Sequence, residues 1–569
     1  MDPSGSPTQA QQEVTNGRHT PIMQEKSTAA DSATEESSQI SEMDIDPENE
    51  VKGLRLLIVH TGICLCTFLV GLDFNLIATA IPVITTQFDS INDVAWYGAA
   101  FYIVLCATQP LAGKMYTLFP KKLVYLVYLV VFEAGSLVCA LAPTSNALIA
   151  GRAVAGLGAS GVFAGGFVLL TSIIPLHKRA IYTATMSSTF AIASIIGPVI
   201  AGAFTTHVTW RWCFYINLPI GGFAAGLIFF IFKLRPAATE NEALAKKLKG
   251  LDIVGFLLFA ASVVMLLLAL QFGGAKYAWN SSQVVGLFVG SGVTMLAFVP
   301  WQLYLQDTAL VTPRIFKNRN AILIFVAAVF VNGPFQLIIY WLPIWFQAVL
   351  GASAESSGIR YLPTVISDAL ASVIGAGLAM QLGFWNPFLL FGYAMVCLGG
   401  GLLTTIHPGI SDGHWIGYQI FGGIGYSLAS NMAHLGLQAS LPTDLVPIGS
   451  TTVLFIMSAA CAIFLSIGQA IFDHRLITEL AKVVPRDIVA EVVSVGATNV
   501  RSIVSGQGLD MVLRAYSDAI TQIWYIPAVA PAISFLLLLA ARWTSLKKTK
   551  TESQVSENSV GQTRSEEEA

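Results

Sequence analysis

Charged residues are scarce in this sequence. Lys, Arg, Asp and Glu together make up 11% of the 569 residues, whereas hydrophobic residues make up 54%. The mean hydropathy is +0.66. A chain with so little charge and so much apolar surface is not an ordinary soluble globular protein. The small net charge of -3 says little here, because the charges are concentrated in tails and connections between apolar stretches.

The seven cysteines do not form a pattern that indicates a disulfide framework or a metal site. All of them lie inside or beside apolar stretches, where a free cysteine packs as a small apolar side chain. The eight histidines are scattered as well, and no His/Asp or Cys/His constellation typical of a membrane acyltransferase is visible. We therefore expect no cofactor, no metal and no enzymatic activity.

The sequence is rich instead in long apolar runs. A helix needs about 20 mostly apolar residues to cross a hydrocarbon layer about 30 Å thick. We identify fourteen stretches of this kind, which predict an all-α polytopic membrane protein with fourteen transmembrane helices. The predicted spans are 54–77, 94–113, 123–142, 147–170, 181–204, 214–232, 253–272, 284–305, 322–345, 359–380, 387–406, 415–437, 450–471 and 520–541.

The remaining segments are polar. Residues 1–50 and the segment from about 547 to 569 are too poor in apolar residues to form a core, so we predict disordered cytoplasmic tails. A longer stretch, about 473–518, mixes charges with apolar residues at helical spacing, which predicts a partly helical external loop.

Basic residues orient the spans. They occur in alternate connections, for example Lys121, Lys122 and Lys178, whereas intervening connections such as 82–93 and 143–146 have none. This pattern places both termini in the cytoplasm. The sequon at Asn280 then falls in an outside loop, so Asn280 is either a glycosylation site or an unused acceptor.

Four charged residues stand out within the predicted spans, away from the span ends, namely Asp73, Glu133, Arg152 and Asp368. Such residues usually face the bundle interior and have a role, because a charge at the bilayer centre costs about 2.5–3.5 kcal/mol. Asp73 lies about 10–13 Å inside the outer end of the first span and Arg152 roughly 9 Å inside the outer end of the fourth. We expect them to pair, either for proton coupling or only to join two helices.

Two other acidic residues have different expected roles. Glu133 has no cation at its depth, and burial favours the neutral form of a carboxyl group. It is either a proton carrier or simply a protonated side chain in hydrocarbon. Asp252 opens the seventh span, and we interpret it as a helix N-cap.

Polar interruptions predict a central binding site. Asp73-Phe74-Asn75 lies in the first span, and residues 332–336 interrupt the ninth with Asn, Gly, Pro and Gln. Breaks in corresponding helices of two halves indicate the substrate site of a secondary transporter. In the twelfth span, Asn431, His434 and Gln438 share one helix face. Aromatic walls are expected from Phe74, Phe335, Tyr340 and Trp341. The predicted cavity residues are Phe74, Asn75, Asn332, Gln336, Tyr340, Asn431 and His434.

Five motifs in order resemble the major facilitator superfamily, specifically fungal members of its fourteen-span drug:proton antiporter branch. They are the segment 72–82 around Asp73, the loop 113–122, the segment 150–158 around Arg152, the antiporter-like 197–202, and the segment 210–221 that follows it. The motif residues that we carry forward are Gly113, Lys121 and Lys122 of the loop and Gly197, Pro198 and Gly202 of the antiporter motif. The loop departs from the family pattern, because Met115, Tyr116 and Thr117 stand where an acidic residue is usual.

The resemblance implies a major facilitator fold. Residues 54–232 and 322–541 would form two six-helix bundles, with 253–305 as a two-helix insert. It also implies that Arg152 takes part in proton transfer. The Gly197-Pro198 pair would form either a stiff bend between the bundles that suppresses ion leak, or an ordinary proline kink.

The expected function is proton-coupled export of small, fairly apolar organic compounds by alternating access. Asp73 or Glu133 would carry the proton, and the charge of Arg152 would favour the ionised form of its neighbour. The expected partners are substrate, protons and the bilayer, with no nucleic acid, in a monomer. The plasma membrane is the expected location, with vacuolar or vesicle membranes as alternatives. Transport of basic amino acids or siderophores and a non-transporting receptor remain alternative functions.

Overall fold

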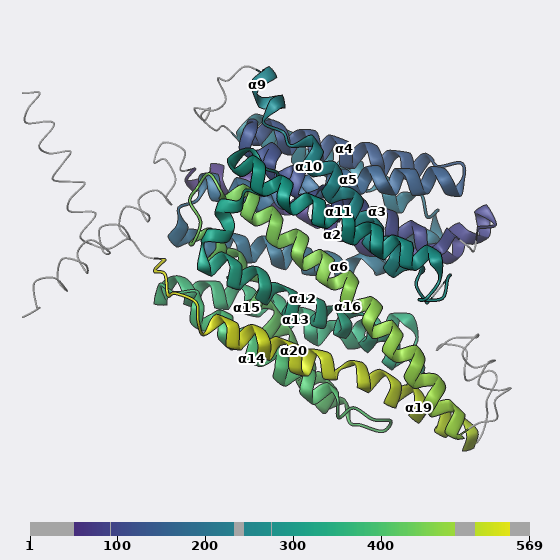
Figure 1. Cartoon of the computed structure of the whole chain (residues 1–569). Helices are drawn as coiled ribbons and strands as arrows, with labels where there is room; N and C mark the ends of the chain where they lie inside the picture. The colour runs from purple at the N-terminus through teal and green to yellow at the C-terminus, as the bar shows by residue number, and fades with distance from the viewer. Residues whose placement is uncertain (1–50, 91–92, 233–243, 275, 484–506, 547–569) are drawn as a thin grey trace, which may run out of the picture. The chain divides into compact units, whose positions relative to one another are not determined.

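The computed structural model describes residues 51–90, 93–232, 244–274, 276–483 and 507–546. The predicted tails therefore lie outside the described residues, and the predicted external loop is described only at its two ends. Within the described residues the chain is helical, and only isolated bridges have β geometry (Figure 1).

The helices fall into three consecutive groups. The first contains α2 (Gly53–Phe88), α3 (Val94–Leu118), α4 (Lys121–Leu141), α5 (Ser145–Ile173), α6 (Leu176–His207), α7 (Trp212–Tyr215) and α8 (Asn217–Ile231). The second contains α9 (Leu244–Lys249), α10 (Ile253–Phe272), α11 (Ser282–Leu305) and the 3-10 turns η4 (Gln306–Thr308) and η5 (Pro313–Lys317). The third contains α12 (Arg319–Ala348), α13 (Ala354–Leu382), α14 (Asn386–Leu403), α15 (Asp412–Gln438), α16 (Val446–Val483), α19 (Gln507–Ile523) and α20 (Tyr525–Leu538).

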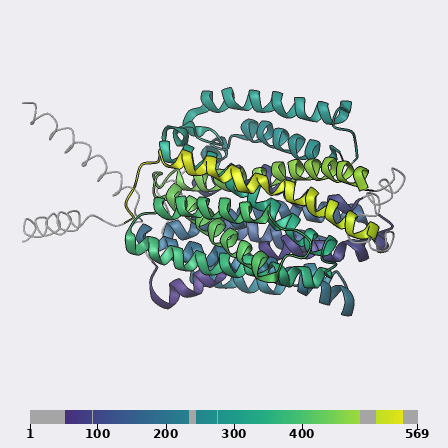
Figure 2. The same ribbon diagram turned by 90° about the horizontal axis from the view of Figure 1, so that it is seen from below.

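Helices pack mainly within their own group. In the first set, α4 packs on α5 and α8, and α2 packs on α6 and α8; in the third, α14 packs on α15 and α20, and α12 packs on α16. The two sets meet where α6 contacts α13 and where α3 contacts α16. The α10–α11 pair lies at the edge, as Figure 2 shows in teal, and α10 contacts both α3 and α16.

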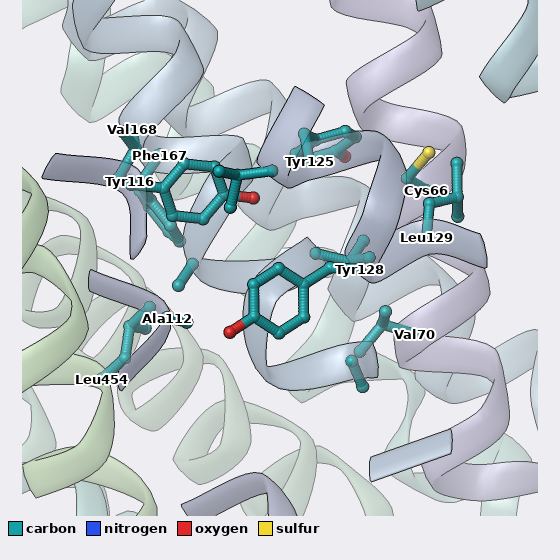
Figure 3. Close-up of a cluster of buried hydrophobic side chains, with 14 of the residues drawn as sticks. Cys66, Val70, Ala112, Tyr116, Tyr125, Tyr128, Leu129, Phe167, Val168 and Leu454 are labelled. Carbon is teal, nitrogen blue, oxygen red and sulfur yellow. The ribbon is translucent and has the colours of Figure 1, made fainter. Parts of the chain in front are cut away.

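Glycine permits the close approach of α4 and α5. A Cβ added at Gly158 would collide with the backbone of Phe132, and one added at Gly135 would collide with the backbone of Ala155. The small residues Gly135 of α4 and Gly158 of α5 therefore let the two helices pack closely. The hydrophobic core beside this contact includes Tyr116 and Tyr125 (Figure 3), and the Tyr116 hydroxyl donates to the carbonyl of Gly161 at 2.9 Å.

Twelve helical stretches of the described residues are long and apolar enough to cross a membrane. Each predicted span falls on helical residues, although the sixth is divided between α7 and α8, and α3 and α15 are not among the twelve. The last predicted span is divided between α19 and α20, and α16 continues beyond the predicted end of its span to Val483.

The predicted interruption of the ninth span is wrong, because α12 runs unbroken through residues 332–336. Proline removes one backbone donor, and a membrane helix tolerates this where neighbouring groups satisfy the backbone. Pro334 removes the donor to the carbonyl of Phe330, four residues earlier. Side-chain bonds support the neighbouring turns, because the amide of Asn332 donates to the carbonyl of Ala328 at 2.9 Å and the Cys461 thiol donates to the carbonyl of Asn332 at 3.6 Å.

The N-cap prediction for Asp252 is confirmed, since its carboxylate accepts from the backbone of Gly255 at 2.7 Å. The same carboxylate accepts from Trp301, Gln302 and the backbone of Leu310 at 2.8, 2.7 and 3.1 Å. Asp252 therefore fixes α10 to α11 and to the segment that follows. Lys114 of α3 donates to the carbonyls of Asp307 and Ala309 in that segment.

Candidate functional site: a pocket between two helix sets

A pocket of about 380 Å³ lies between the first and third helix sets. Its wall comes from α2, α3, α5 and α6 on one side and from α12, α13, α15 and α16 on the other. Among the predicted cavity residues, the ones that line it are Phe74, Asn75, Asn332, Gln336, Asn431 and His434. Residues far apart in the sequence thus meet where the sequence predicted a site.

Local packing fixes the α2 side of the pocket. The amide of Asn75 donates to the carbonyl of Gly71 at 2.8 Å and to the hydroxyl of Ser194 on α6 at 3.2 Å. Gly197 lets α6 approach, because a Cβ there would lie 3.1 Å from the Cβ of Asn75. The first glycine of the antiporter motif therefore positions a pocket residue.

Aromatic rings form two walls. On the first set, Phe74 makes edge-to-face contacts with Phe101, Tyr102 and Phe190, with centroid separations of 5.0, 5.1 and 5.8 Å. On the third set, Phe335 of α12 and Tyr426 of α15 are stacked at 4.1 Å with an interplanar angle of 6°. Such surfaces suit flat aromatic ligands.

Tyr340 is not part of the pocket. Its side chain is 49% exposed on the outer surface of α12, so its assignment to the cavity is wrong. A step of four residues overshoots one helical turn by about 40°, and the stripe that starts at Asn332 has rotated off the pocket by Tyr340. Trp341 is buried, but it packs on Phe472 at 4.5 Å instead of lining the pocket.

Asp368 of α13 is the one carboxylate among the described pocket residues, which include no Lys or Arg. From the sequence, Asp368 was singled out only as a charge in the membrane.

Gln109 of α3 is a pocket residue that was not predicted from the sequence. It is fully buried in the pocket wall, and within the described structure neither of its amide atoms has a hydrogen-bond partner. A scan for amides as well as charges within spans would have found it.

The predicted pairing of Asp73 with Arg152 is confirmed. Arg152 Nη1 donates to Asp73 Oδ2, and its Nε donates to the carbonyl of Tyr97 at 2.9 Å. Both side chains are buried, and neither lines the pocket. Phe101 contacts both the guanidinium, at 4.4 Å, and Phe74 of the pocket wall. One aromatic ring thus links the ion pair to the pocket.

Glu133 also lies outside the pocket wall. Its carboxyl group sits against Gly221 of α8, where an added Cβ would collide with it. Both carboxyl oxygens are buried without a hydrogen-bond partner in the described part of the chain.

The loop motif anchors helix ends. Lys121 donates to the hydroxyl of Ser172 on α5 at 2.8 Å. Lys122 donates to the carbonyls of Phe229 and Phe232 at the end of α8, at 2.7 and 2.6 Å, where a cation complements the helix dipole. We call the end of the molecule with Lys114, Lys121 and Lys122 the basic end. Gly113 meets Thr451 of α16 there, so this glycine permits a contact between the sets.

The two sets are in contact toward the basic end. Ser372 of α13 donates to the carbonyl of Ala184 on α6 at 3.0 Å. Phe167 of α5 and His434 of α15 stack at 4.3 Å, near the ends of their helices. These contacts lie on the side of the pocket toward the basic end.

The structure also places the rest of the antiporter motif, the sequon and the cysteines. Pro198 lies within α6, and a Cβ added at Gly202 would meet open space, so Gly202 makes no close contact. Asn280 is exposed in the turn before α11. All seven cysteines are free, and no group of potential metal ligands occurs among the described residues.

Comparison with known proteins adds the family. The model of the Major Facilitator Superfamily matches residues 63–468. The chain is 39% identical over 536 residues to "MFS-type efflux pump MFS1" of Arthroderma benhamiae, covering 93% of this chain and 99% of that protein. It is 41% identical over 489 residues to "Efflux pump roqT" of Penicillium rubens, covering 86% and 91%.

Solved structures share the fold at low identity. The human organic anion transporter MFSD10 (TETRAN) matches with a TM-score of 0.55 and 12% identity, over 86% of this chain and all of that one. A double-tryptophan mutant of XylE matches with a TM-score of 0.54, also at 12% identity, covering 86% and 96%.

Proposed function

This chain belongs to the major facilitator superfamily, and on that premise we propose that it is a secondary transporter that exports small organic compounds in exchange for protons. Membership makes it a transporter and not an enzyme. Export is proposed because relatives at 39–41% identity are named efflux pumps.

The pocket between the two helix sets is the observation that carries this proposal. Alternating access requires a site that both halves of the protein share and that opens to one side at a time. Both sets contribute to the pocket wall, and contacts between the sets lie on the side of the pocket toward the basic end. If the basic end faces the cytoplasm, this arrangement corresponds to an outward-facing state.

In the proposed architecture, residues 54–232 and 322–541 form two bundles and 253–305 an insert, with fourteen spans in total. The count includes α3 and α15. Both helices contribute polar side chains to the pocket wall. Gln109 comes from α3, and Asn431 and His434 come from α15. A helix that lines a polar pocket needs fewer apolar residues than one that faces lipid, which accounts for their lower hydropathy.

The proposed coupling uses three acidic groups. Protonation of Asp73 would release Arg152, and Phe101 would pass the change in geometry to Phe74. Asp368 would contact the cargo directly and favour cations over anions, because no basic residue among the described lining residues opposes it. Glu133 would hold a second proton.

A cationic cargo also fits the alternative of basic amino acid or siderophore transport, since Asp368 would bind an ammonium group. The aromatic walls favour flat ring systems over aliphatic amino acids. We propose a monomer in the plasma membrane, with protons and small organic compounds as its partners.

Proteoliposomes test this function. The full-length protein is reconstituted, and uptake of ethidium is measured with an acidic interior; ethidium carries a permanent charge, so a pH gradient alone does not redistribute it. We expect gradient-dependent uptake that an ionophore abolishes and that protein-free vesicles lack. Binding of ethidium without net flux would instead indicate a receptor, and flux that survives collapse of the gradient would exclude proton coupling.

A further inference from the structure

The segment 210–221 has no role in the pocket, and its contacts lead to Glu133. We propose that Asn217 and Gly221 are positioning residues that hold Glu133 as a neutral, proton-bearing acid between α4 and α8. The site itself stands on the contacts below; its use in transport rests on the proposed function.

The beginning of the segment docks it on the ends of α2 and α4. Trp210 Nε1 donates to Gln87 Oε1 at 2.7 Å, and Arg211 Nη2 donates to the carbonyl of Ala142 at 2.8 Å. Ala142 follows the last residue of α4, where a cation complements the negative end of the helix. These bonds fix where α8 starts relative to α4.

The register that results pairs two positions on α4 with two on α8. Asn217 Nδ2 donates to Ser136 Oγ at 3.0 Å, with both side chains fully buried. About one turn further along α8, Gly221 lies against the carboxyl group of Glu133, about one turn earlier on α4. Any side chain at position 221 would occupy the space of this carboxyl group.

The buried oxygens at this site lack donors. In the described structure, both oxygens of Glu133 and Oδ1 of Asn217 have no hydrogen-bond partner. An ionised carboxylate buried in this way is very costly, whereas a proton makes the group neutral and supplies the missing donor. The arrangement therefore fits a bound proton better than a negative charge.

No neighbouring cation in the described structure neutralises an ionised Glu133 through an ion pair. Asp73 and Cys66 of α2 lie near Glu133, and α8 carries no titratable side chain. Arg152 binds Asp73 and the carbonyl of Tyr97. Within the described residues Glu133 itself forms no ion pair.

Infrared spectroscopy of the full-length protein in lipid tests the site without any cargo. The probe is the proton itself, and the readout is the carbonyl stretch of a neutral carboxylic acid near neutral pH. The variants are E133Q, N217L and G221A, and G222A is the matched control, because a Cβ at Gly222 meets nothing within 4 Å. The double variant E133A/G221A removes the collision and restores folding if G221A is unstable.

We expect a neutral-acid band with a component that E133Q removes, that G221A weakens by more than half or shifts, that N217L shifts, and that G222A leaves unchanged. The proposal is overturned if the band of E133Q equals that of the wild type, or if G221A and G222A behave alike. If the band behaves as expected while ethidium flux is independent of the gradient, the site stands and only proton-coupled transport fails.

Discussion

Arg152 of α5 binds Asp73 of α2 through Nη1 and Oδ2, and neither side chain is open to solvent. The pair joins the first and fourth predicted spans at one depth, next to a ring that also contacts the pocket wall. In the proposed coupling, protonation of Asp73 would act on the pocket through the contacts of Phe101.

Neutralising one partner of this pair should destabilise the protein. D73N or R152Q leaves the other charge buried without compensation, which costs about 3–5 kcal/mol. The double variant D73N/R152Q removes both charges and should lose much less than the sum of the single losses. Denaturant unfolding in detergent measures this; single losses below about 1 kcal/mol would show that the pair contributes little.

Removal of an aromatic wall should weaken cargo binding. F335A removes one member of the Phe335–Tyr426 stack, and loss of a ring contact worth about 1 kcal/mol weakens ethidium binding roughly fivefold to tenfold. Fluorescence titration of the reconstituted protein gives the Kd. Y340A is the matched control on the same helix, and its Kd should be unchanged since Tyr340 lies outside the pocket. Equal effects of both variants would contradict the pocket assignment.

The charge of the pocket should set its selectivity. D368N removes the one carboxylate of the described pocket wall, so ethidium should bind about tenfold more weakly, while a neutral aromatic amide of similar size keeps its affinity. The control is D412N, since Asp412 is 74% exposed and lies outside the pocket. Competition binding in nanodiscs measures both ligands. An unchanged preference for the cation in D368N would remove Asp368 from the cargo site.

The insert should depend on Asp252. D252A deprives four donors of their acceptor, namely the backbones of Gly255 and Leu310 and the side chains of Trp301 and Gln302. Buried donors left unpaired cost about 1–3 kcal/mol each, so we expect a loss of about 3 kcal/mol or more and early proteolysis near η4. D307N is the control, since the exposed Asp307–Arg314 pair at 3.5 Å contributes about 1 kcal/mol or less. Similar stability of both variants would contradict this role.

Much of the fold and of the site was predictable from the sequence, because the membrane restricts both the length of apolar helices and the places where polar side chains can lie. Apolar length places helices, and depth along two helices predicted that Asp73 and Arg152 meet. The polar residues Asn75, Asn332 and Asn431 reached the pocket because a polar side chain in a span avoids lipid. The number of fourteen spans stays a prediction, since α3 and α15 are helices of mixed character.

Other features depended on geometry that a sequence does not contain. Tyr340 follows the spacing of the pocket residues, but the drift of a helical stripe carries it to the outer surface. The proline in α12 looked like a break, but a membrane helix tolerates the loss of one backbone donor, and α12 continues through Pro334. The contact of Glu133 with Gly221 depends on how α4 and α8 are aligned. Hydrogen bonds of Trp210 and Arg211, which are distant from Glu133 in the sequence, set this alignment.

Gradient-driven uptake of ethidium by D73N/R152Q in proteoliposomes tests the central claim most directly. The account predicts that the double variant still binds ethidium and exchanges it across the membrane, yet no longer accumulates it against a concentration difference when the interior is acidic. Accumulation at the wild-type rate would contradict the proposed coupling through Asp73 and Arg152.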